Sequence, residues 1–155
     1  MAITNYALNM DKAFAGMLYD LSAHTVDSFA VEDADGIGTA AAVIRGTDPE
    51  QQVKAASATG DGAKVIGVTL HTHIEPPEDG KKYYPQHYTV PVVTRGRLWV
   101  QTGGAVNAGD EAHLKLADGT FVKDAVAAGT IEALGCGAKF ITSCDKAGLA
   151  VIEIG

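Results

Sequence analysis

The sequence contains few of the residues on which chemical sites usually depend. Among 155 residues there are only two cysteines, Cys136 and Cys144, and one tryptophan, Trp99, and there is no CxxC pair. This excludes a dense disulfide framework and a metal site of the CxxC kind. Free buried thiols are the favoured interpretation of the two cysteines, and nothing in the sequence supports a disulfide between them.

Basic residues are also scarce. The chain has 12 lysines and arginines against 19 aspartates and glutamates, a net charge of −7, and Lys81-Lys82 is its one adjacent basic pair. A nucleic-acid partner normally requires a basic patch, so none is expected, and the acidity favours solubility or a basic partner surface. The N-terminus lacks the features of a signal peptide, and no apolar run approaches the roughly 20 residues of a membrane helix. We therefore expect synthesis in the cytoplasm and no membrane partner.

Motifs for nucleophilic or phosphate chemistry are missing too. No serine lies in a GxSxG pattern, and no glycine-rich segment is followed by the lysine of a phosphate loop. Asp33, Asp35 and Gly36 resemble the start of a calcium loop, but the twelfth position is Ile44 instead of a glutamate. Turns are expected at these places. The sequence predicts no catalytic residue.

One histidine pattern offers an alternative, a metal-binding site. His71 and His73 form an HxH pair on a predicted strand, and alternation places both rings on one face. With Glu78, and His113 as a late fourth group, they partly match a cupin-like metal-binding enzyme. Pro85 stands where a closing glycine is expected, and no second motif occurs further along the chain. Solvent-facing or interface histidines are favoured over a metal site.

What the sequence has in quantity is short apolar runs separated by turns. The hydrophobic fraction is 46% and there are 18 glycines, so one compact domain with a real core is expected. Strands are predicted at about 39–46, 63–74, 87–94, 96–102, 111–116, 120–123, 130–134, 138–143 and 149–154. This spacing is typical of an all-β fold, a small β-barrel or β-sandwich of the β-tulip-like kind.

The stretch 90–122 is the most informative part of the chain. Its glycine turns separate three or four short strands, with Trp99 in the middle. Four apolar residues share parity and point to one face if the strand register holds across the glycine at position 96: Val90, Val92, Leu98 and Val100. Trp99 then faces the other way and is expected in or against the core or at a subunit interface.

The segment 1–31 differs from the rest of the chain. It holds all three methionines, and Met10, Phe14, Met17 and Leu21 have helical spacing that Gly16 interrupts. We interpret it as an N-terminal arm before a β-domain at 32–155. Bulky apolar residues outside a compact body need a surface to dock on. The alternative is an ordinary first strand or helix that packs on its own domain.

A second candidate contact lies in the proline-rich loop 75–88. Tyr83, Tyr84 and Tyr88 cluster there beside Lys81-Lys82. Aromatic residues beside cations can stack on bases or sugars, but tyrosines also anchor protein interfaces. With the net charge of −7, a protein contact is favoured, and a sugar-binding module is the weaker alternative.

The order of these motifs resembles a known family. Its carrying features are AITNYALNM and AFAGMLYD near the N-terminus, then AAVIRGT (41–47), VIGVTLH (65–71), VPVVTRGRLWVQTGGAVNAGDEAHL (90–114) and LGCGAKFITSCDKAGLAVIEI (134–154). Together they resemble the capsid cement or decoration proteins of tailed bacteriophages. The resemblance spans nearly the whole chain, and its motifs are glycine turns and strand residues instead of catalytic groups.

The resemblance implies a virion structural protein that is not an enzyme and needs no cofactor. Such a chain binds the outside of the major-capsid shell and stabilises it after expansion, with the major capsid protein and itself as partners, as homotrimers at threefold or quasi-threefold positions. Another head or tail component of the virion is the alternative within the same particle. Capsid binding is expected of the apolar arm residues Ile3, Tyr6, Leu8, Met10, Phe14, Met17 and Leu18, and further interface contacts of Tyr83, Tyr84, Tyr88 and Trp99.

Overall fold

The computed structural model describes residues 13–72 and 82–155, and this part of the chain is almost entirely β. Its strands are β1 (Thr25–Val31), β2 (Ala42–Arg45), β3 (Gln52–Ala55), β4 (Gly67–Thr69), β5 (Thr89–Gln101), β6 (His113–Lys115), β7 (Phe121–Val122), β8 (Ile131–Ala133), β9 (Ala138–Phe140) and β10 (Leu149–Ile154). The one helical element in these residues is the short 3₁₀ turn η1 (Gly62–Lys64). None of their helices is long and apolar enough to cross a membrane. The all-β prediction is confirmed.

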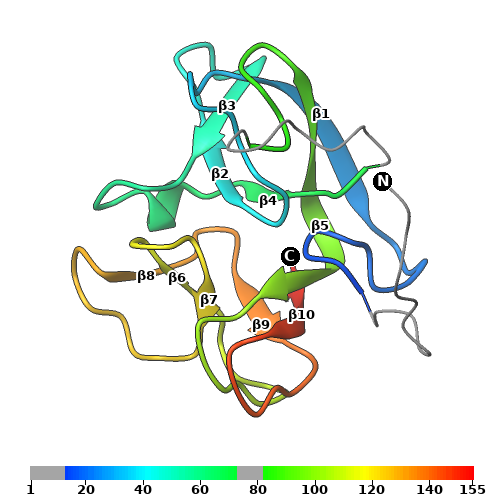
Figure 1. Ribbon diagram of the computed structural model, residues 1–155, viewed down its shortest axis with the longest axis vertical. Helices are drawn as coiled ribbons and strands as arrows, with labels where there is room; N and C mark the ends of the chain where they lie inside the picture. The colour runs from blue at the N-terminus through cyan, green and yellow to red at the C-terminus, as the bar shows by residue number, and fades with distance from the viewer. Residues whose placement is uncertain (1–12, 73–81) are drawn as a thin grey trace, which may run out of the picture.

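Five strands close into a barrel. Their order is β1-β3-β2-β4-β5, and a further pairing of β1 with β5 completes the ring. Beyond the barrel, β10 and β9 extend the sheet from β5, and a separate sheet has the order β7-β6-β8. Figure 1 shows the barrel in the upper half of the molecule and β6–β10 in the lower half.

The long strand β5 belongs to both halves. Its first part pairs with β1 and β4, and its second part, 96–101, pairs antiparallel with all of β10. In Figure 1 it runs from the top of the barrel into the lower half. A single continuous strand therefore fixes the two halves relative to each other.

A bulge in β5 changes which side chains share a face. Thr25 lies opposite Arg95 but Val26 lies opposite Val93, so one residue of β5 is extra. Val90 and Val92 consequently face the barrel interior, whereas Leu98 and Val100 belong to a different core. The sequence prediction placed these four residues on one face on the condition that the strand register holds across Gly96. That condition is not met, because the extra residue inverts the alternation of side chains.

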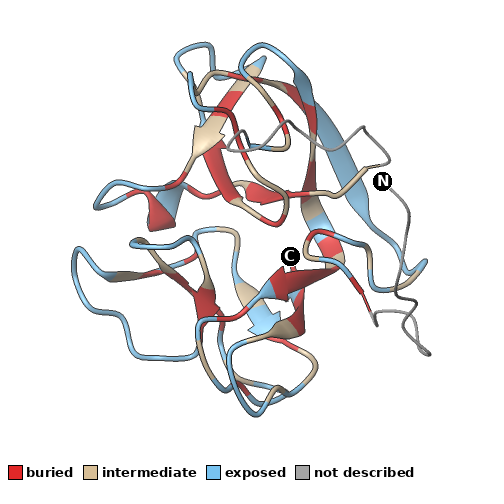
Figure 2. Ribbon diagram, in the orientation of Figure 1, coloured by how far each residue is buried: buried red, intermediate tan, exposed pale blue. Residues whose placement is uncertain are grey.

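Two cores result. The barrel interior is filled by Phe29, Val31, Ile37, Val43, Val53, Tyr84, Val90 and Val92. The larger core lies between the outer face of the barrel and the lower half, where Ile44, Val68 and Val93 meet side chains of β6, β7, β9 and β10, among them Leu114, Phe121, Phe140 and Ile152. Figure 2 shows buried residues in both halves and along β5.

Gly96 allows β5 to continue after the bulge. Its φ is +134°, and a Cβ placed there would lie 2.7 Å from the Cβ of His24. Both the backbone conformation and the space exclude a side chain at this position.

The N-terminal part pairs with β5 from Gly16 onward, first through an isolated bridge and then through β1. Leu18 lies opposite Leu98, and after an excursion at 20–24 the chain continues as β1 beside the first part of β5. The described end of the segment 1–31 therefore contributes a barrel strand, β1. The excursion and the glycine at position 16 hide the strand alternation from the sequence. Residues 1–12 lie outside the described residues.

Candidate functional site

Exposed large hydrophobic side chains concentrate on one edge of the molecule. Five of the seven found in the described residues lie within 14–26, and we call them the N-terminal strip: Phe14 (57% exposed), Met17 (43%), Tyr19 (43%), Leu21 (93%) and Val26 (36%). The other two are Tyr88 and Val126. Single exposed hydrophobic residues are common, but several within one short segment are typical of an interaction surface.

Backbone hydrogen bonds hold the strip on β5. The N–H of Gly16 donates to the carbonyl of Trp99 (2.6 Å), the N–H of Trp99 donates to the carbonyl of Met17 (2.8 Å), and the N–H of Tyr19 donates to the carbonyl of Arg97 (3.0 Å). Ala13 is buried against Trp99 and Val151. The strip is therefore held on β5 at Met17 and Tyr19.

An ion-pair network fixes the end of this pairing. The Arg97 guanidinium contacts Asp20 at 3.4 Å and Glu153 at 2.5 Å, so it joins the N-terminal strand to β10. Hydrogen bonds from Ser22 hold the pKa of Asp20 below its usual range, with a smaller contribution from Arg97. All three charged side chains are at least one third exposed, so the network contributes to position more than to stability.

Aromatic rings connect the strip to the loop after residue 82. Phe14 stacks on His71 with ring centroids 5.7 Å apart, and His71 contacts Tyr83 at 5.2 Å. Tyr83 donates its hydroxyl to the carbonyl of Thr72 (2.6 Å) and packs edge-on against Tyr84. No sequence pattern links these segments, because they lie far apart along the chain.

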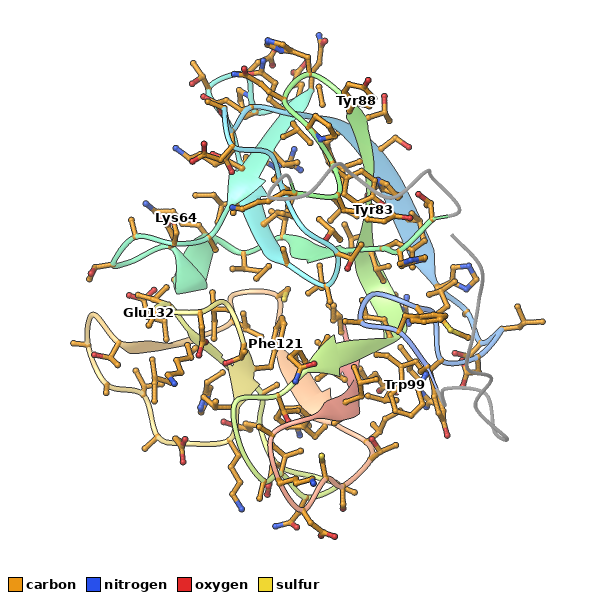
Figure 3. The ribbon with its side chains drawn as sticks, viewed as in Figure 1. Lys64, Tyr83, Tyr88, Trp99, Phe121 and Glu132 are labelled. Atoms are coloured by element: carbon orange, nitrogen blue, oxygen red, sulfur yellow. The ribbon has the colours of Figure 1, made fainter. Side chains whose placement is uncertain are left out.

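The four residues proposed as further interface contacts differ in exposure. Tyr84 is 0% exposed, its hydroxyl donates to the carbonyl of Leu70, and burial raises its pKa. It is thus a core residue, because the isolated bridge to Ile37 draws the loop into the barrel. Trp99 is 6% exposed beneath the strip, Tyr83 is half-buried, and Tyr88 is 59% exposed. Figure 3 shows Tyr88 at the top of the barrel and Trp99 beside the N-terminal strand.

The predicted capsid-binding residues divide into two groups. Ile3, Tyr6, Leu8 and Met10 lie outside the described residues. Of the others, Phe14 and Met17 are on the strip, while Leu18 turns inward and packs against the larger core. Sequence reasoning missed three members of the strip: Tyr19, Leu21 and Val26. The alternation Met17-Tyr19-Leu21 was the available indication of a strand there.

The metal-site candidates do not form a cluster in the part of the chain that the structure describes. No group of three or more histidine, cysteine, aspartate or glutamate side chains is placed to hold an ion there. His71 is occupied by ring stacking, and His113 has its Nδ1 2.7 Å from the carbonyl of Asp124. Its Nε2 lies 3.7 Å from a carboxylate oxygen of Glu111. His73 and Glu78 lie outside the described residues.

The two cysteines are free thiols. Both are partly exposed instead of fully buried, and burial raises the pKa of the Cys136 thiol. A raised thiol pKa lowers the fraction of nucleophilic thiolate, so Cys136 lacks the character of a reactive cysteine.

Comparison with known proteins gives two results. Residues 3–155 match the family model described as structural cement protein (E217 gp24/Pam3 gp6). The fold is similar to a chain in the solved capsid of the Myoviridae phage XM1, with a TM-score of 0.71 and 17% identity over 99% of this chain and 97% of that one. At this identity the structural likeness concerns the fold alone. No curated protein sequence matches this chain.

Proposed function

This chain belongs to the phage structural cement protein family and has the role of a capsid cement protein. On that premise, we propose that it attaches to the outer surface of the shell through its N-terminal strip. It is a structural component associated with the virion. In the proposed role it binds the major capsid protein after the shell has expanded, and it stabilises the expanded form.

The observation that carries this proposal is the concentration of exposed hydrophobic side chains within 14–26. Each such side chain contributes on the order of 1–3 kcal/mol when a partner buries it fully. Because backbone hydrogen bonds to β5 already fix the strand, docking of the strip costs little further ordering entropy. The apolar residues Ile3, Tyr6, Leu8 and Met10 are proposed to extend the same contact.

Self-association completes the proposal. We infer homotrimers at threefold or quasi-threefold positions, made in the host cytoplasm and acting without a cofactor or catalytic activity. The structural nature of the family supports the part of the proposal that concerns catalysis. Several weak contacts per trimer on a symmetric shell add to a high avidity, which suits a small chain with a short apolar strip.

The test is binding to shells that lack the protein. The double variant Met17→Ser/Leu21→Ser removes two exposed side chains of the strip, and Val126→Ser removes an exposed side chain from the far loop of the lower half as a matched control. We expect the double variant to melt like the wild type but to lose at least about tenfold in affinity in co-sedimentation, since two apolar contacts disappear. Equal binding of all three proteins would refute the strip as the attachment surface.

A further inference from the structure

The N-terminal strand leaves one sheet edge open. β3 pairs with β1 only at Ala30 and Val31, so β1 has no neighbour on that side from Thr25 to Phe29 among the described residues. The N–H of Ala30 donates to the carbonyl of Gln51 and therefore points away from β5. Alternation along the strand gives Val26 and Ser28 the same orientation, with their N–H and C=O groups directed outward.

The open edge continues through Leu18. The hydrogen bonds to β5 come from the carbonyl of Met17 and the N–H of Tyr19, which flank Leu18. Leu18 is thus a non-hydrogen-bonded position of the antiparallel pair, and its own backbone groups point away from β5. In Figure 1 this strand and β1 form the outer right-hand side of the molecule.

The edge also lacks the usual protection. Natural sheet edges carry lysine, proline or a covering element that prevents another strand from pairing. No lysine, arginine or proline occurs between Gly16 and Phe29. Asp20 is held by Arg97, and Asp27 is 3.3 Å from the hydroxyl of Thr94, so the acidic side chains of the edge are already engaged.

We propose that residues 4–10 of a second copy of this chain add to this edge as a strand, so that neighbouring copies exchange their N-termini. The segment TNYALNM places Tyr6, Leu8 and Met10 on one face and the small or polar Asn5, Ala7 and Asn9 on the other, which is the alternation of a half-exposed strand. The twelve residues before Ala13 can span up to roughly 40 Å when extended.

The position of Ala13 favours a second copy over the same chain. Ala13 packs on Trp99 and on Val151 of β10, which pairs with β5 on the edge opposite to the N-terminal strand. Ala13 therefore lies over the β5–β10 pair and not beside β1, and for this reason we name a second copy as the donor.

This inference rests on the proposed self-association and agrees with the proposed attachment. Strand addition uses backbone groups, so the side chains of Tyr6, Leu8 and Met10 remain free to extend the N-terminal strip of the accepting copy. The exchanged strand would then add its apolar face to the surface that meets the shell.

Full-length variants test the exchange. Ser28→Pro removes an outward N–H from the acceptor edge, a position at which proline leaves the pairing with β5 intact, and Ser28→Ala is the control that retains the N–H. Asn5→Pro/Leu8→Pro alters the donor, and because these positions differ in parity, one proline always lies on the pairing side. We expect the wild type and Ser28→Ala to self-associate in analytical ultracentrifugation. Each proline variant should associate at least about tenfold more weakly.

Mixing the two proline variants gives the decisive result. Asn5→Pro/Leu8→Pro retains an intact edge, and Ser28→Pro retains an intact N-terminus. The mixture should therefore form a one-to-one heterodimer, although each variant alone associates at least about tenfold more weakly than the wild type. Circular dichroism and melting establish that both are folded. If Ser28→Pro does not fold, amide exchange of the wild type replaces it, with concentration-dependent protection expected at Val26 and Ser28. Any of four results would overturn the exchange: a mixture that stays monomeric, a monomeric wild type, amide protection independent of concentration, or proline variants that associate as strongly as the wild type. Decoration of shells by the same proteins tests the proposed function separately.

Discussion

Replacing Glu132 should lower the free energy of unfolding and weaken the cooperativity between the two halves of the molecule. This glutamate of β8 is 9% exposed, and its two carboxylate oxygens accept the N–H groups of Gly60 (2.6 Å) and Gly62 (2.7 Å) in the segment leading into η1. The N–H of Gly135 donates back to the carbonyl of Gly62 at 2.9 Å. Figure 3 shows Glu132 in the lower half, facing the part of the upper half that carries Lys64.

The size of the effect depends on those two bonds. Glu132→Ala removes both acceptors and leaves the buried N–H of Gly62 without a partner, at a cost of about 1–3 kcal/mol. Gly60 is exposed, so water replaces its lost acceptor, and the expected total loss stays at about 1–3 kcal/mol. That is a large fraction of the roughly 5–15 kcal/mol that stabilises a typical domain. Glu132→Gln keeps one acceptor and should lose about half as much.

Urea unfolding at neutral pH measures the change, with tryptophan fluorescence and far-ultraviolet circular dichroism as two probes. Trp99 lies on β5 and the strands lie in both halves, so non-coincident transitions in Glu132→Ala would show that the halves unfold separately. Glu50→Ala, at an exposed turn, is the matched control and should change stability by less than about 0.5 kcal/mol. A loss below about 1 kcal/mol for Glu132→Ala would refute the reasoning.

Three further predictions concern β5 and the barrel rim. Trp99→Ala should cost about 3–5 kcal/mol in urea unfolding, because the ring is 6% exposed beneath the N-terminal strand; a change near zero would contradict this packing. Gly96→Ala should destabilise by at least about 1 kcal/mol, since φ is +134° and His24 occupies the space, whereas Gly104→Ala, with open space around it, should not. Hydrogen bonds from Thr47 lower the pKa of Glu32, so their stabilisation is present at neutral pH and lost as the pH falls through that lowered pKa. Thr47→Val should raise the Glu32 pKa toward its ordinary range in an NMR titration, and an unchanged value would contradict the assignment.

The sequence predicted the fold class because turns are local. Glycine turns and short β-branched runs specify where strands begin and end, whatever packs on them, and together they indicate a small barrel. It could not predict the bulge in β5 near Thr94, because one extra residue is invisible without the partner strand. The burial of Tyr84 was hidden for a similar reason, since the residue lies in a loop that pairs with Ile37, far away in sequence.

The N-terminal segment shows why the candidate site was harder to predict than the core. Its apolar residues were assigned together to capsid binding, yet Leu18 faces the core while Met17 and Tyr19 face outward. Only the pairing with β5 decides which of these residues face the core and which face solvent, because an extended segment presents alternate side chains to opposite faces.

An open, apolar edge is a hazard for a free protein, and the charge of the chain bears on this hazard. A net charge of −7 opposes the approach of copies in solution at random, and the repulsion weakens with salt over a Debye length of about 8 Å. A shell that holds copies side by side replaces diffusion by a high effective concentration, at which a short strand pairing becomes stable. The same edge that is weakly associating in solution is therefore well suited to link copies once the lattice has positioned them.

On this argument, self-association in solution should strengthen as salt increases from about 0.05 to 0.5 M, because screening removes the repulsion and leaves backbone and apolar contacts intact. Association that weakens with salt would show that ion pairs, and not the sheet edge, hold the copies together.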